Sequence, residues 1–179
     1  MTNNSLPEPW LRGPIAGIVP QLQPAAHALL QVLEDCERAA AGLNSAHLWT
    51  ELGGAASVGF HLRHLSGSID RLLTYARGLS LSDAQKVALA AEKTSGDPSA
   101  TPTDLLSSLR RAIERALEQF RATPTTSLFD RRVVGRAKLP STVLGLLFHA
   151  AEHAQRHTGQ VVTTAKILKG LGIDTPAAT

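Results

Sequence analysis

His153 and His157 are the two residues of this chain whose types and spacing suggest chemistry most directly. On an α-helix, residues four apart lie one above the other, with Cβ atoms about 5–6 Å apart. Two imidazoles placed in this way can turn ring nitrogens toward one ion, because a Zn–N bond is only about 2.0–2.1 Å long. A third imidazole from a neighbouring helix would leave one coordination position open, as catalytic metal sites do.

The third imidazole has two candidates, His61 and His64, on an earlier predicted helix. Periodicity places His61 nearer the apolar stripe of that helix, but it fixes the helix phase too coarsely to choose, so both stay open. His149 extends the ladder of the last helix but points further toward solvent. The alternative interpretation is that these rings only form hydrogen bonds at the edge of the core, because a single His-x-x-x-His pair is weak evidence for a site.

Other polar residues could line the same pocket. Ser68, Arg71 and Tyr75 follow His64 along one side of its helix. Arg71 could hold a carboxylate or phosphate in its guanidinium fork, although a surface or helix-packing role is favoured for Arg71 and Tyr75. Gln160, close after His157, could orient a ligand ring. Cys36 lies in a run typical of packing and is predicted to be buried rather than nucleophilic.

Four long amphipathic segments must position these residues. Apolar periodicity predicts helices over residues 25–42, 57–76, 103–121 and 140–170, a short helix after the capping-box sequence at 82–85, and a hairpin-like excursion within 125–139. This pattern predicts an all-α, up-down four-helix bundle with a short extra helix and a small hairpin-like insertion before the last helix. We expect an extended N-terminal arm over residues 1–21, anchored by Trp10 and Leu11, the bundle domain over 22–170 and a loose C-terminal tail over 171–179.

The composition is that of an ordinary globular protein, with 179 residues, 43% hydrophobic and 18% charged. The single cysteine, Cys36, excludes an intramolecular disulfide, and no signal peptide or membrane-spanning run is visible, so a cytoplasmic protein without a membrane partner is predicted. The net charge of +3 is mild and no aromatic residues interleave with the arginine clusters, which argues against nucleic acid as a partner. A homodimer is compatible with the sequence, which contains no feature that proves it.

The chain resembles the DinB-like (DinB/YfiT) superfamily of bacterial metal-binding four-helix bundles. The resemblance rests on the run from Ser57 through His64-Leu65 and on the run from His153 through Gly159-Gln160, and it covers most of the chain, from about Pro24 to Leu168. It implies that His64, His153 and His157 are the ligands of a divalent transition metal such as zinc, nickel or iron. Members with known activity include thiol-dependent transferases and isomerases that use low-molecular-weight thiols such as mycothiol or bacillithiol.

The resulting prediction is a metal-dependent enzyme that activates such a thiol, or water, against a small electrophile, as a thiol S-transferase or a hydrolase would. Three neutral ligands leave the metal its full charge, which strengthens it as a Lewis acid. Two alternatives stay open: a metal-binding bundle without catalysis, acting in stress response or as a dimerising partner, and a helical interaction module whose histidines are structural.

Overall fold

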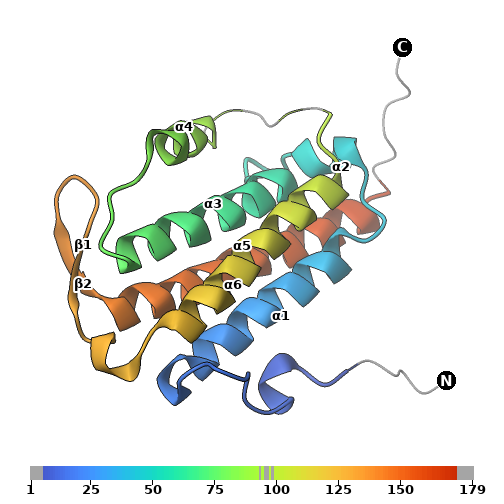
Figure 1. Ribbon diagram of the computed structural model, residues 1–179. Helices are drawn as coiled ribbons and strands as arrows, with labels where there is room; N and C mark the ends of the chain where they lie inside the picture. The colour runs from blue at the N-terminus through green and yellow to red at the C-terminus, as the bar shows by residue number, and fades with distance from the viewer. Residues whose placement is uncertain (1–5, 93, 95–96, 98, 173–179) are drawn as a thin grey trace.

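Four long helices form the centre of the protein (Figure 1). The computed structural model describes residues 6–92, 94, 97 and 99–172. The long helices are α1 (Gln23–Ala40), α3 (Val58–Ala76), α5 (Pro102–Ala122) and α6 (Val143–Gly170). The shorter elements are α2 (Ser45–Trp49), α4 (Asp83–Ala91), three 3-10 turns (Pro9–Leu11, Pro20–Leu22 and Thr125–Ser127) and the antiparallel hairpin of β1 (Arg131–Val134) and β2 (Leu139–Thr142). The predicted four-helix bundle, with a short extra helix and a hairpin before the last helix, is confirmed.

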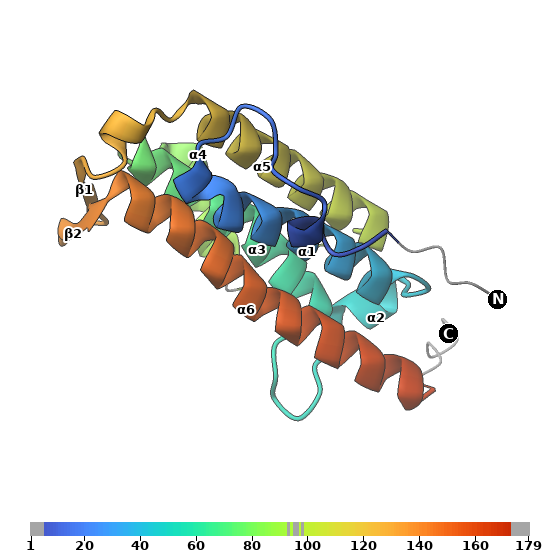
Figure 2. The ribbon, with the colours of Figure 1, turned by 90° about the horizontal axis from the view of Figure 1, so that it is seen from below.

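The structure gives the order of the helices and corrects the predicted up-down direction at one step, because α3 and α5 run in the same direction. Both α5 and α6 pack against α1 and against α3, so α1 and α3 face each other across the bundle. The ribbon views show α1 and α6 running in one direction and α3 and α5 in the other (Figures 1 and 2). The connection from α3 to α5 therefore returns along the length of the bundle, and it carries α4 on the outside of α3 (Figure 1).

Each long helix buries one apolar face at helical spacing. The core formed in this way includes the fully buried side chains Leu29, Leu62, Leu65, Ile69, Leu109, Ile113, Phe120 and Leu147. Because the buried residues of α3 recur three and four apart, they fix the rotation of that helix about its axis. The same holds for α6, whose buried residues alternate with the histidines along its middle.

One predicted boundary is wrong. Pro140 and Ser141, predicted to open the last helix, lie in β2 opposite Val133 and Arg132. The helix starts after Thr142, whose hydroxyl accepts a hydrogen bond from the Gly145 N–H at 3.0 Å and so caps it. The segment over 44–54, between two predicted helices, contains the short helix α2, which begins at an Asn44 capping box.

The described part of the predicted N-terminal arm packs on the bundle through Ile15, Ile18 and Val19 and through several polar contacts. Arg12 forms an ion pair with Glu34 at 2.6 Å, and Nε2 of His27 lies 3.0 Å from the carbonyl oxygen of Gly13. Trp10 is 61% exposed and Leu11 is 56% exposed, so the prediction that they anchor the arm is wrong. Residues 1–5 and 173–179, at the ends of the predicted arm and tail, lie outside the described residues.

No helix in the described part of the chain has both the length and the apolar character needed to cross a bilayer.

Candidate metal centre

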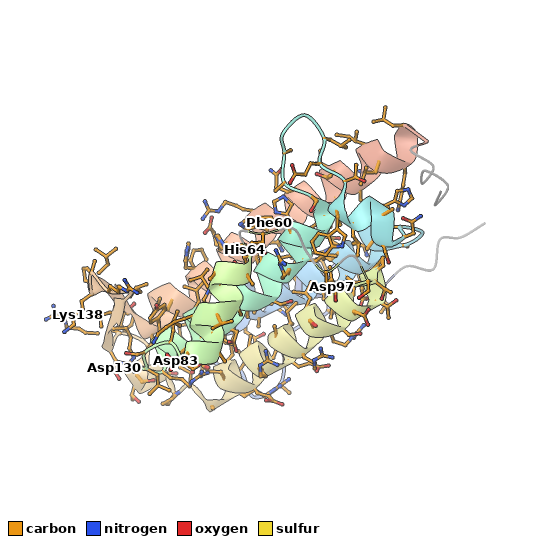
Figure 3. All side chains as sticks on the ribbon, turned by 90° about the horizontal axis from the view of Figure 1, so that it is seen from above. Phe60, His64, Asp83, Asp97, Asp130 and Lys138 are labelled. Carbon is orange, nitrogen blue, oxygen red and sulfur yellow. The ribbon has the colours of Figure 1, made fainter. Side chains whose placement is uncertain are left out.

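Three histidines from two helices meet at one point of the bundle. His64 of α3 and His153 and His157 of α6 each offer a ring nitrogen, and these atoms all lie within 4.8 Å of one another. The Nε2 atoms of His64 and His153 are 2.9 Å apart. The ring centroid of His157 lies 4.4 Å from that of His64 and 4.6 Å from that of His153. Figure 3 shows His64 and Phe60 on α3, beside the end of α4.

The helix packing explains why these side chains converge. Ser57 caps α3 by accepting a hydrogen bond from the Phe60 N–H at 3.2 Å, which starts the helix two turns before His64. The buried Leu62 and Leu65 on either side of His64 hold that face of α3 against the bundle. His64 is left at the edge of the core, partly buried, facing the histidines of α6. All three histidines are partly exposed.

His61 and His64, which periodicity left as alternatives, both contact the histidines of α6. His61 is only 7% exposed, and its Nδ1 lies 3.0 Å from Nδ1 of His157. It therefore occupies the outer nitrogen of the His157 ring, and Nε2 of His157 remains for another ligand. His64 is the member of this pair that shares a common point with His153 and His157.

A pocket of about 250 Å³ opens beside the cluster. It is lined by His64, Ser68, Arg71, Leu72, Tyr75, Leu81, Leu89, His149 and His153. The residues predicted to follow His64 along α3 therefore do reach one pocket. His149 is exposed, as predicted from its position away from the core face of the helix. Its Nδ1 lies 3.1 Å from Oε2 of Glu152.

Two predicted roles are not supported by the structure. Gln160 is exposed and forms no hydrogen bond to a histidine within the described part of the chain, so nothing here gives it an orienting role. Arg71 is not a surface residue and not a free anion clamp but a buried packing residue between α3 and the α4 segment: it is 8% exposed and donates two hydrogen bonds to Glu92, at 2.6 and 3.2 Å.

Glu92 is the residue that sequence reasoning missed. It lies at the C-terminal cap of α4, is 6% exposed, and its Oε2 accepts a hydrogen bond from Nδ1 of His64 at 2.8 Å. Burial by itself would raise the pKa of Glu92, but hydrogen bonds from His64 and Arg71, with the charge of Arg71, outweigh burial and hold the pKa below its usual value. Glu92 is therefore an ionised acceptor at neutral pH.

Gly67 of α3 is the residue whose type reflects this buried contact. A Cβ atom at Gly67 would lie 2.5 Å from Oε1 of Glu92 and 2.7 Å from Nη1 of Arg71. A glycine inside a helix costs about 1 kcal/mol relative to alanine, so an isolated one suggests a close approach by another group. The glycine does not identify the group that approaches. Because Glu92 is 28 residues from His64 in the chain, no local spacing connects the two residues.

His153 and His157 are neutral at physiological pH. The pKa of His153 and of His157 is lowered to about 4. Burial is the largest cause, and repulsion of a protonated ring by neighbouring imidazoles and by Arg156 adds to it. Burial and the proximity of His64 also lower the pKa of His61. Neutral rings have a lone pair on one nitrogen, which is the form that binds metals.

The cluster fits a divalent transition metal. Two metal–nitrogen bonds of about 2.1 Å in tetrahedral geometry separate the ligand atoms by about 3.4 Å, a spacing that small ring rotations would produce here. The Nδ1 atoms of His64 and His157 already have partners, so both rings present Nε2. Imidazole ligands suit zinc, nickel and iron alike, and the donor set does not choose among them.

Comparisons with known proteins agree with this description. A sequence model of the DinB superfamily matches residues 21–161, a range that includes all three histidines. A search of curated proteins finds no significant match.

Two solved structures have a similar fold. A conserved protein from Enterococcus faecalis has a TM-score of 0.64 and 18% identity, over 83% of this chain and 97% of its own. YfiT from Bacillus subtilis, described as a probable metal-dependent hydrolase with an unusual four-helix bundle topology, has a TM-score of 0.63 and 17% identity, over 88% of this chain and 93% of its own. At these identities the likeness establishes the fold.

Proposed function

We propose that this chain, which belongs to the DinB superfamily, is a metal-dependent enzyme acting on a small molecule. The nucleophile is a low-molecular-weight thiol or water, and the acceptor is a small electrophile. The observation that carries this proposal is the convergence of His64, His153 and His157 beside an open pocket. A structural metal site would be closed by a fourth protein ligand, and the three-ligand arrangement with a pocket is typical of catalytic sites.

The three histidines would hold the metal through their ring nitrogens. A divalent metal ion supplies Lewis acidity, which lowers the pKa of a coordinated water or thiol. The buried surroundings keep His153 and His157 neutral, and Glu92 and His61 occupy the outer nitrogens of His64 and His157. These contacts orient two of the three rings before any ligand binds.

The pocket favours a small and largely uncharged electrophile. Leu72, Leu81 and Leu89 supply apolar walls, and Tyr75 adds a phenol. The charge of Arg71 is already compensated by Glu92, so this arginine is not free to select an anionic substrate. A volume of about 250 Å³ admits a small molecule or the reacting end of a larger one.

The nucleophile has to come from outside the chain. Cys36 is buried between α1 and α6, where its Sγ lies 3.8 Å from the hydroxyl of Thr158. Burial raises the pKa of the Cys36 thiol to about 12, so the thiol stays protonated at neutral pH. The predicted burial of Cys36 is confirmed, and a thiol reaction at the histidines would need a cosubstrate.

An activity screen tests the proposal. We expect the protein loaded with zinc, nickel or iron to show saturable turnover in one of two assays: conjugation of a thiol (cysteine or glutathione) to chlorodinitrobenzene, or hydrolysis of p-nitrophenyl acetate. The His153→Ala/His157→Ala double variant should lose it. His27→Ala is the matched control, because His27 contacts Gly13 outside the cluster. Metal binding without turnover in either assay would contradict catalysis on these probes and favour the metal-binding bundle without catalysis.

A further inference from the structure

We infer that Glu92 is a positioning residue for the metal, which fixes the ring of His64 and ties the α4 segment to the metal centre. The inference rests on the proposed function, since it names the residue that prepares one of the three ligands. No pattern in the sequence connects Glu92 with His64, and the connection comes from the fold.

Several hydrogen bonds hold Glu92 in one position against α3. Its Oε2 accepts from Nδ1 of His64 at 2.8 Å, and both carboxylate oxygens accept from Arg71. Arg63 donates to the backbone carbonyl oxygens of Glu92 at 3.1 Å and of Thr94 at 2.8 Å. Gly67 leaves the space that the carboxylate fills. Side chain and backbone of Glu92 are thus both held against α3.

Helix stability does not explain a carboxylate at this position. Glu92 caps the C-terminal end of α4, where the helix dipole disfavours a negative charge. Burying a carboxylate is also unfavourable unless it is paired. The α4 helix itself buries none of its residues, so Glu92 is not drawn inward by an apolar face. Positioning of His64 explains why a negatively charged Glu92 lies at this place.

The carboxylate decides which nitrogen of His64 faces the other rings. Both of its oxygens accept from Arg71, so toward Nδ1 of His64 it acts as an acceptor. Nδ1 then carries the proton and Nε2 presents its lone pair. Nε2 is the atom 2.9 Å from His153. A carboxylate on the outer nitrogen of a metal-binding histidine fixes its orientation, and its loss weakens metal affinity by about 10–100-fold.

Because Glu92 belongs to the segment that carries α4, metal binding and docking of that segment are linked. Within the described part of the chain, Gln85 supplies the further side-chain contact between α4 and α3: its Nε2 donates to Asp70 at 2.6 Å and to Thr74 at 2.8 Å. This coupling runs through the hydrogen bond between Glu92 and His64, so docking changes metal affinity only where that contact is lost.

The test compares zinc affinity in three proteins by competition with a chromophoric chelator. We expect Glu92→Gln to bind Zn²⁺ at least about 10-fold more weakly than the wild type. Gln85→Ala is the matched control, because it removes the other anchor of α4 and leaves the contact with His64 intact. Its affinity should stay within about 3-fold of the wild type, since it disturbs no hydrogen bond to a metal-binding histidine.

A second readout uses the metal-free proteins, in which ¹⁵N-labelled histidine rings report the tautomer by NMR. We expect His64 to be protonated at Nδ1 in the wild type and in Gln85→Ala, and to lose this preference in Glu92→Gln. A merely structural role of Glu92 would leave the tautomer unchanged.

The outcomes separate the inference from the proposed function. If the wild type binds no zinc, the proposed function fails and the inference fails with it. If the wild type binds zinc and Glu92→Gln binds it equally well with the same His64 tautomer, only the inference is overturned. Equal weakening in Gln85→Ala and Glu92→Gln would assign the effect to α4 docking in general and would also overturn it.

Discussion

Replacement of Arg71 by methionine is expected to lower the free energy of unfolding by about 3–5 kcal/mol. Arg71 and Glu92 are 8% and 6% exposed and their nearest polar atoms are 2.6 Å apart. Methionine would fill part of the arginine volume but would leave the ionised Glu92 buried without its main partner. Removing one member of a buried pair is costly because the remaining charge is uncompensated. Urea denaturation of the metal-free proteins measures the change.

The double variant Arg71→Met/Glu92→Gln is the control for this prediction. Removing both charges leaves no unpaired ion, so we expect the double variant to be more stable than Arg71→Met alone. If Arg71→Met loses less than about 1 kcal/mol, the pair behaves as a solvent-exposed one, and the buried ion pair described for this site is wrong.

Acidification of the metal-free protein is expected to reduce its stability steeply between about pH 6.5 and pH 4. The pKa of His153 and of His157 is lowered to about 4 in the folded protein, and the pKa of His61 is lowered as well. In the unfolded chain these groups titrate near 6.5, so over this interval the unfolded state binds more protons than the folded state. Stability is then fully present above the unfolded pKa and is lost as the pH falls through the window.

The control for the pH dependence replaces the two titrating rings of α6 by an amide. His153→Gln/His157→Gln should show a shallower loss of stability across the window, measured by urea denaturation at fixed pH in the presence of chelator. The lowered pKa of Glu92 contributes its own loss only below its usual range, at more acidic pH. An unchanged slope in the variant would contradict the account of buried, neutral histidines.

The fold follows from the sequence because its signals are local and repeated. The apolar stripes of the four long helices and the capping box at Ser82 appear in the structure where the pattern predicts them. The order and directions of the helices depend on how the faces pair in three dimensions. Periodicity alone does not contain that information. The boundary error at Pro140 arose because proline also opens helices, whereas here β2 continues to Thr142 and the helix starts after it.

The site was predictable to the extent that its residues share a helix. His153 and His157 are four residues apart, and this spacing determines that both rings point the same way. The choice between His61 and His64 required the phase of α3 relative to α6. Glu92 and its bond with Arg71 depend on the α4 segment folding back across α3, which no spacing in the sequence encodes. The cytoplasmic location, the role in stress response and the homodimer stay predictions.

The most direct test of the account is the metal content of the purified, untagged protein after incubation with zinc, nickel or iron and gel filtration. We expect about one equivalent of metal per chain in the wild type and none in His153→Ala/His157→Ala, with helical circular dichroism retained in both. A wild type that retains no metal under any of the three conditions, or a double variant that retains as much as the wild type, would contradict a metal centre at His64, His153 and His157.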